Sequence, residues 1–119
     1  MKIAVTSMGG DLTSAVDPRF GRAAYILIVD TETKDFKVID NMVNVNAFKG
    51  AGIQAATMIA EAGAEVLLTG YCGPNAFRTL EAAGIKVGSD ITGTVADVVV
   101  AFLVGKINFI ETANAEGHL

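Results

Sequence analysis

The second half of the chain alternates short apolar segments with segments of helical periodicity, and this alternation restricts the fold more than any other feature. Glu65–Thr69 is an almost entirely apolar run, as expected for a central strand covered on both faces. A predicted helix over about residues 52–62 precedes it. Another helix follows at Pro74, where the missing N–H costs nothing. Because such crossovers link parallel strands, the pattern predicts an α/β domain.

The remaining segments extend this sheet and add one helix. Strands are predicted at residues 3–5, 25–30, 36–40 and 85–87, the middle two forming a hairpin. A last helix begins at Thr94, with Asp97 in the position of a capping box, and its apolar residues follow one helix face. We therefore expect a three-layer α/β/α fold with a mixed, roughly five-stranded sheet and helices on both faces.

The length of 119 residues allows one domain. We expect residues 1–106 to form it, with a loop at 41–49, and residues 107–119 to form a short, frayed C-terminal tail. No charged n-region or long apolar h-region precedes the first strand, and the longest apolar run is too short to span a membrane. We expect a cytoplasmic protein that does not associate with membranes.

Charge and composition exclude several classes of function. The net charge of −4 argues against general nucleic-acid binding, which needs a basic face to displace counterions from phosphates. The chain has one cysteine, Cys72, and one histidine, His118, so it can form neither an intramolecular disulfide nor a four-ligand Cys/His zinc site. Because His118 lies in the predicted tail, it cannot build a convincing Ser–His or Cys–His pair. The sequence therefore does not predict an enzyme.

Four glycine-containing loops are predicted at the carboxyl ends of strands, where open α/β sheets bind their ligands. These loops are residues 7–10, 49–52, 70–73 and 89–94. Three of them lead into helices, where free N–H groups and the helix dipole favour an anion. Any one of these glycines could equally serve a turn or a cap. The convergence of several loops on one edge is what favours a binding site.

The segment Asp17–Arg22 places two arginines around an aromatic residue and a glycine. Arginine suits anions with several oxygen or sulfur atoms, because it carries a fixed charge and several donors. Phe20 would then provide an apolar wall. The alternative is that Arg19 and Arg22 pair with surface carboxylates while Phe20 fills the core.

Cys72 lies between a predicted strand and the helix that begins at Pro74. A thiol at a helix N-terminus has a lowered pKa and becomes a nucleophile or a ligand for soft metals. The alternative is a small buried hydrophobic residue, the usual role of a lone cysteine. Met8 is a second candidate for a soft donor.

Several motifs also occur in an order typical of a known family. They are KIAV at 2–5, DPRFGRA at 17–23, YILIVDTET at 25–33, GAGIQAA at 50–56, TGYCGPNAF at 69–77, LEAAGIKV at 80–87 and GTVADVVVAFLVGK at 93–106. Over residues 1–106 the chain resembles the dinitrogenase iron-molybdenum cofactor biosynthesis family, small proteins that carry or store metal–sulfur cofactors and their precursors. The resemblance implies a ribonuclease H-like fold.

The resemblance also implies a noncovalent site for a molybdenum–copper sulfide cluster or a related iron–molybdenum–sulfur cluster. Many relatives carry His before the Phe-Gly-Arg triplet, where this chain has Arg19, so charge pairing becomes the main attraction. Cys72 is the candidate metal ligand, and residue chemistry adds Met8 and Lys49 to the site. The loop residues that the resemblance implies are Arg19, Phe20, Gly21, Arg22, Gly50, Ala51, Gly52, Tyr71, Cys72, Gly73, Thr92, Gly93 and Thr94.

Two other classes of function stay open beside this hypothesis. A ribonuclease H-like hydrolase would need clustered carboxylates on its central strands, but the run Glu65–Thr69 offers only Glu65 at its start. The second class is a protein–protein interaction module, a partner of an iron–sulfur assembly or signalling ATPase or of cluster donor and acceptor proteins. We predict a protein that binds, carries or stores a cluster and is not an enzyme.

Overall fold

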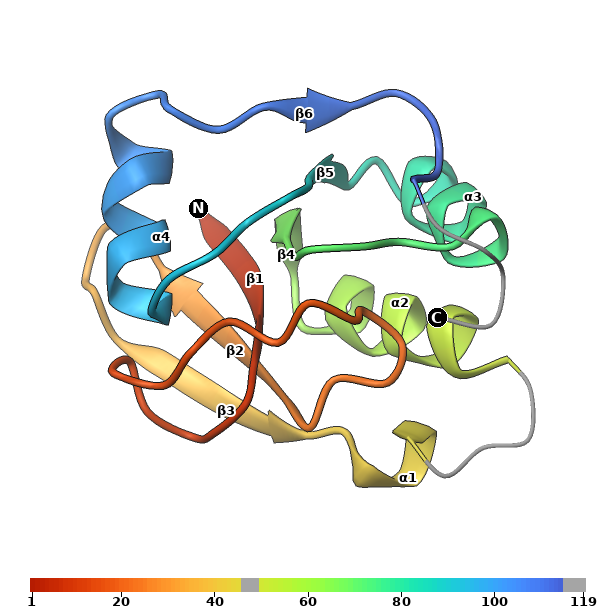
Figure 1. The fold of residues 1–119 in the computed structure, drawn as a ribbon, viewed down its shortest axis with the longest axis horizontal. Helices are drawn as coiled ribbons and strands as arrows, with labels where there is room; N and C mark the ends of the chain where they lie inside the picture. Colours follow the sequence, from red (N-terminus) through yellow and green to blue (C-terminus); the bar gives the residue numbers. More distant parts are fainter. Residues whose placement is uncertain (46–49, 115–119) are drawn as a thin grey trace.

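A mixed sheet of six strands runs through the residues that the computed structural model describes, 1–45 and 50–114 (Figure 1). Its order is β3-β2-β1-β4-β5-β6. The central strands β1, β4 and β5 are parallel, whereas β2, β3 and β6 are antiparallel to their neighbours. The strands are β1 Lys2–Ser7, β2 Tyr25–Asp30, β3 Phe36–Asp40, β4 Ala64–Leu68, β5 Lys86–Gly88 and β6 Phe109–Ile110.

Helices cover both faces of this sheet, so the expected three-layer arrangement is confirmed. One core packs α2 and α3 against inward-facing residues such as Ala4 and Leu67. The other core packs α4 against the opposite face, where Val5 and Leu68 point. The helices are α1 Met42–Val45, α2 Ala51–Glu61, α3 Pro74–Ala82 and α4 Val95–Leu103.

The sixth strand was not expected. Val87 and Gly88 of β5 pair antiparallel with Ile110 and Phe109 of β6. An added Cβ on Gly88 would lie 2.6 Å from a methyl carbon of Ile107, so the absence of a side chain allows this close approach. The expected fraying is therefore wrong for residues 107–114, because the sheet and its core hold this segment.

The expected loop at residues 41–49 is also partly wrong, because Met42–Val45 form the short helix α1. The Asp40 carboxylate accepts the Met42 N–H at 2.9 Å and so satisfies one of the free N–H groups at the start of α1. Lys49 lies outside the described residues. Within the part of the chain that the structure describes, no helix is long and apolar enough to cross a membrane.

The connection between β1 and β2, residues 8–24, crosses the edge where the parallel strands end. It passes from the side of α4 to the side of α2, red to orange in Figure 1. Isolated bridges attach Ala15 to Thr94 and Arg19 to Tyr71 along this path. Segments that are distant in the sequence therefore meet at the carboxyl ends of β1 and β4.

Candidate functional site

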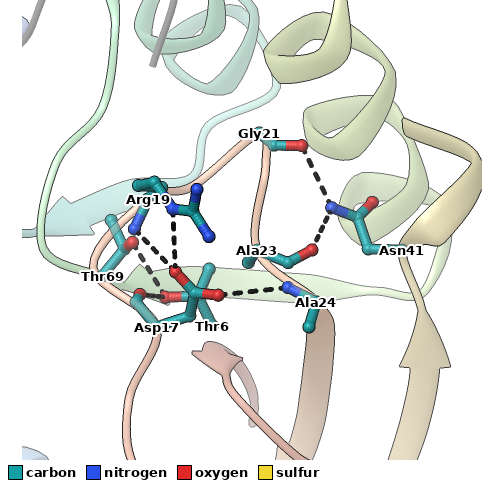
Figure 2. A network of polar contacts seen from close by, with 8 residues as sticks. All are labelled: Thr6, Asp17, Arg19, Gly21, Ala23, Ala24, Asn41 and Thr69. Carbon is teal, nitrogen blue, oxygen red and sulfur yellow. Dashed lines mark hydrogen bonds and ion pairs between the residues drawn. The ribbon is translucent and has the colours of Figure 1, made fainter. Parts of the chain in front are cut away.

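The fully buried carboxylate of Asp17 organises the arginine-containing loop, as Figure 2 shows. Its Oδ1 accepts the Arg19 N–H at 3.1 Å, and its Oδ2 accepts the Ala24 N–H at 3.2 Å. The Arg19 Nε lies 3.6 Å from the same Oδ1, which gives an ion pair. The carboxylate therefore links Arg19 to Ala24 across the loop and fixes the position of the Arg19 backbone.

Three other polar residues hold this loop against the sheet and the start of α1 (Figure 2). The Thr6 hydroxyl contacts the Asp17 carbonyl oxygen at 2.6 Å and is hydrogen-bonded to the Thr69 hydroxyl at 2.9 Å. The Asn41 side chain donates to the carbonyls of Gly21 at 3.1 Å and Ala23 at 2.8 Å. These contacts from β1, from the end of β4 and from Asn41 give the loop a defined shape.

Phe20 points inward from this loop and is fully buried among the residues of α2 and α3. Of the two alternatives for this residue, the structure supports a core side chain rather than a wall that contacts a ligand. The next residue, Gly21, lies against the start of α2, where an added Cβ would lie 2.6 Å from the Gly52 nitrogen. Packing of Phe20 thus brings the loop into backbone contact with the helix.

The same loop pairs with the segment that follows β4. Tyr71 donates its N–H to the Pro18 carbonyl at 2.6 Å, and its own carbonyl accepts the Phe20 N–H at 3.2 Å. Tyr71 is 44% exposed, so it lies at the surface, and its backbone pairs with that of Arg19. The predicted loops at 17–22, 50–52 and 70–73 therefore meet at one place.

Cys72 does not have the environment that lowers a thiol pKa. Its side chain is fully buried in the core between the sheet and α2 and α3. Burial raises the pKa of the thiol to about 12, from a usual value of 9.0. The expectation of a lowered pKa at the helix N-terminus is therefore wrong, and the geometry agrees with a small buried hydrophobic residue.

The three helix N-termini at this edge differ in how their N–H groups are satisfied. At α4 the Thr94 hydroxyl accepts the Asp97 N–H at 3.1 Å. The carbonyls of residues 14 and 12 accept the N–H groups of Val95 and Ala96 at 2.9 Å. These donors are no longer available to an anion, unlike the expectation for Thr92, Gly93 and Thr94.

The N-termini of α2 and α3 instead lie side by side. An added Cβ on Gly52 would lie 2.7 Å from the Cβ of Ala76, so the two helices approach closely at their first turns. Their N-cap residues are Gly50 and Gly73, and no side-chain cap is present at either end among the described residues. Two helix dipoles therefore direct their positive ends to the same region.

The cationic side chains and the second soft donor occupy different places. The Arg19 side chain is 49% exposed, and its backbone pairs with Tyr71. Arg22 is half-buried and follows Gly21, the residue that lies against the start of α2. Met8 is exposed at the beginning of the connection, where its N–H donates to the Ala15 carbonyl at 2.9 Å. Among residues 1–45 and 50–114, no group of three or more His, Cys, Asp or Glu side chains could hold a metal ion.

The polar residues that hold the loops of the candidate site in place through hydrogen bonds were not identified from the sequence. In the sequence, Asp17 begins the Asp17–Arg22 segment and Asn41 begins the loop predicted at 41–49, and neither was assigned a supporting role. Asn114 lay in the predicted tail, yet it bonds to the segment after β4. The Asp17-Pro18 turn was the available signal, because Asp often binds the backbone two residues ahead.

Together these features define a three-layer α/β protein with an arginine-bearing, glycine-lined edge. Its sequence matches the model of the family described as dinitrogenase iron-molybdenum cofactor over residues 1–105. The chain belongs to this family. The resemblance predicted from the ordered motifs is thus confirmed.

Particular relatives are similar to this chain in structure or in sequence. The apo form of the orange protein from Desulfovibrio gigas is similar, with a TM-score of 0.94 and 48% identity over 96% of each chain. A solution structure of a protein from Thermotoga has a TM-score of 0.84 and 37% identity over 98% of each chain. An uncharacterised protein of Methanocaldococcus jannaschii is 30% identical over 99 residues, which are 81% of this chain and 83% of that protein.

Proposed function

We propose that this protein binds an anionic metal–sulfur cluster noncovalently and carries or stores it without catalysing a reaction. The observation that carries the proposal is the position of the arginine loop, which pairs with Tyr71 just before α3 through Arg19 and lies against the start of α2 through Gly21, where the first turns of α2 and α3 meet. Membership of the cofactor family supports the kind of cargo. The similarity to the orange protein supports it independently of the site geometry.

The donors at this edge fit a cluster that brings its own sulfur ligands. Sulfide anions need positive charge and N–H donors around them, and guanidinium groups supply both. A protein thiolate is not required, and the raised pKa of Cys72 disfavours one. We therefore propose that Cys72 packs beneath the site and does not ligate metal.

The cargo we propose is a molybdenum–copper sulfide cluster or a related iron–molybdenum–sulfur cluster. The residues we assign to it are Arg19, Arg22, Tyr71 and the stretch Gly50–Gly52. Thr92, Gly93 and Thr94 lie at the other end of the connection, where the α4 N–H groups are already bonded, so we leave them out. We keep as predictions a partnership with cluster donor or acceptor proteins, ATPases among them. The cytoplasmic location and the ribonuclease H-like classification are also predictions.

The proposal is tested by adding tetrathiomolybdate and copper to the apoprotein and following the visible charge-transfer absorption. The double variant Arg19→Ala/Arg22→Ala should bind roughly 100-fold or more weakly at low salt, because each of the two lost charge-assisted hydrogen bonds contributes about 1.5–3 kcal/mol. The residual binding should depend less on salt, since the screened Coulomb attraction has been removed.

The matched control is Lys37→Ala/Lys106→Ala, which removes the same charge from exposed positions on β3 and after α4. This control should bind like the wild type. Uptake by the double arginine variant equal to that of the wild type at low salt would show that the arginine loop is not the site.

A further inference from the structure

Asn114 joins the C-terminal segment to the loop that follows β4. Its Oδ1 accepts the Cys72 N–H at 2.8 Å, and its Nδ2 donates to the Gly70 carbonyl at 3.2 Å. Its own N–H donates to the Cys72 carbonyl at 3.2 Å. One residue therefore makes three hydrogen bonds to a segment that lies more than 40 positions earlier in the chain, with separations of 42 and 44 for the side-chain bonds.

The opposite edge of the same segment is bonded to the arginine loop. Tyr71 exchanges hydrogen bonds with Pro18 and Phe20, at 2.6 and 3.2 Å. The segment Gly70–Cys72 is thus a short extended piece with the arginine loop on one edge and Asn114 on the other. The side-chain amide of Asn114 acts here as a peptide group would in a neighbouring strand, because it supplies one donor and one acceptor.

This arrangement determines what the segment offers to a ligand. The N–H groups of Tyr71 and Cys72 already have acceptors within the protein, so they are not available to an anion. What remains is the half-exposed Tyr71 side chain, held beside Arg19 by a backbone bonded on both edges. The Gly70 carbonyl also accepts the Asp90 N–H at 3.0 Å, and the Asn114 N–H would keep its bond to the Cys72 carbonyl without the side chain. Loss of the Asn114 side chain therefore frees the Cys72 N–H and loosens the segment that holds Tyr71, without detaching it.

We propose that Asn114 is a positioning residue of the cluster site, acting through the Gly70–Cys72 segment on Tyr71 and the arginine loop. The inference rests on the proposed function, since it assigns a role within that same site. According to this inference, residues 111–114, which follow β6, support the edge that we propose as the binding site (Figure 1). Asn114 itself need not touch the cluster.

The first part of the test uses the apoprotein and amide hydrogen exchange measured by NMR. Asn114→Ala should accelerate exchange of the Cys72 amide roughly tenfold or more, as loss of one hydrogen bond predicts. Amides of β1 should not change. Asn108→Ala is the matched control, because Asn108 is exposed in the same segment and its side chain makes no hydrogen bond to any described residue.

A second variant keeps the test valid if Asn114→Ala does not fold. Asn114→Asp retains an acceptor for the Cys72 N–H but loses the donor to Gly70, so Cys72 exchange should lie between wild type and Asn114→Ala. Exchange of the Cys72 amide within about twofold of wild type in the folded Ala variant would overturn the inference, because one lost bond should give about tenfold.

The second part measures a property that a merely structural bond would leave unchanged. Tetrathiomolybdate and copper are added to each variant, and the visible circular dichroism of the bound cluster is recorded. The Asn114 variants should give an altered band shape and weaker uptake, whereas Asn108→Ala should match the wild type. Altered exchange with an unchanged spectrum and uptake would mean that Asn114 supports the loop but does not position the site. Failure of the wild type itself to bind would instead refute the proposed function.

Discussion

The buried thiol of Cys72 makes a prediction that separates a packing residue from a metal ligand or nucleophile. Its pKa is raised by burial to about 12, against a usual value of 9.0. At any pH well below 9 this difference of about three units lowers the thiolate fraction roughly 1000-fold relative to an unfolded chain. Because the thiolate is the reactive species, alkylation of the folded protein should slow by a factor of this order.

The same shift predicts a loss of stability in alkaline solution. The folded-state pKa is higher than the unfolded-state pKa, so the folded state retains its proton while the unfolded state ionises. The contribution of the protonated thiol to the free energy of unfolding is unchanged below about pH 9, and it declines as the pH rises toward the folded pKa of about 12. At about 1.36 kcal/mol per pH unit, the loss is about 1.4 kcal/mol at pH 10 and approaches 4 kcal/mol near pH 12.

The assay combines iodoacetamide labelling, read by mass spectrometry, with urea unfolding between pH 7 and pH 10.5. Cys72→Ala is the control for unfolding, because it retains every other group that titrates at alkaline pH and lacks only the thiol. The free energy of unfolding of wild type should fall more steeply with pH than that of the variant. Labelling in native buffer as fast as in denaturant, or parallel pH profiles for the two proteins, would refute the assignment of Cys72 as a buried, protonated residue.

Two further substitutions test the packing that supports the site. Phe20→Ala should lower the free energy of unfolding by about 3–5 kcal/mol in urea, because it empties a fully buried aromatic position, whereas Phe36→Ala at a 39% exposed position should cost much less. Thr94→Ala should cost about 1 kcal/mol through loss of the cap that accepts the Asp97 N–H, while Thr92→Ala, exposed and outside the helix, should leave stability within about 0.5 kcal/mol. Equal effects within either pair would contradict the contact assigned to it.

The sequence predicted the central part of the fold because its signals are local. The apolar run before Thr69, Pro74 at the first turn of α3 and the capping pair Thr94–Asp97 each determine an element through neighbouring residues. The strand β6 was missed because two residues have no periodicity, and only pairing with Val87 and Gly88 makes them a strand. Its existence depends on the finished sheet rather than on local propensity.

The candidate site was also predicted only in part from the sequence. Strand ends and glycines located the edge, because parallel strands must end together. Sequence could not show that Phe20 points into the core, that α4 has its N–H groups bonded, or that burial raises the pKa of Cys72. Each of these outcomes depends on which distant segment packs against the residue. The supporting contacts of Asp17 and Asn114 were hidden for the same reason.

The span of the contacts at this edge has a kinetic consequence. Thr6 and Thr69 are separated by 63 residues, and Asn114 and Gly70 by 44, so the edge forms only after large loops have closed. Loop closure costs entropy before these contacts stabilise the chain. We therefore expect folding to be slower than the roughly microseconds to milliseconds of helical bundles, with this edge of the sheet among the last parts to become native. Acquisition of binding would then report completion of folding, whereas helix content would appear earlier.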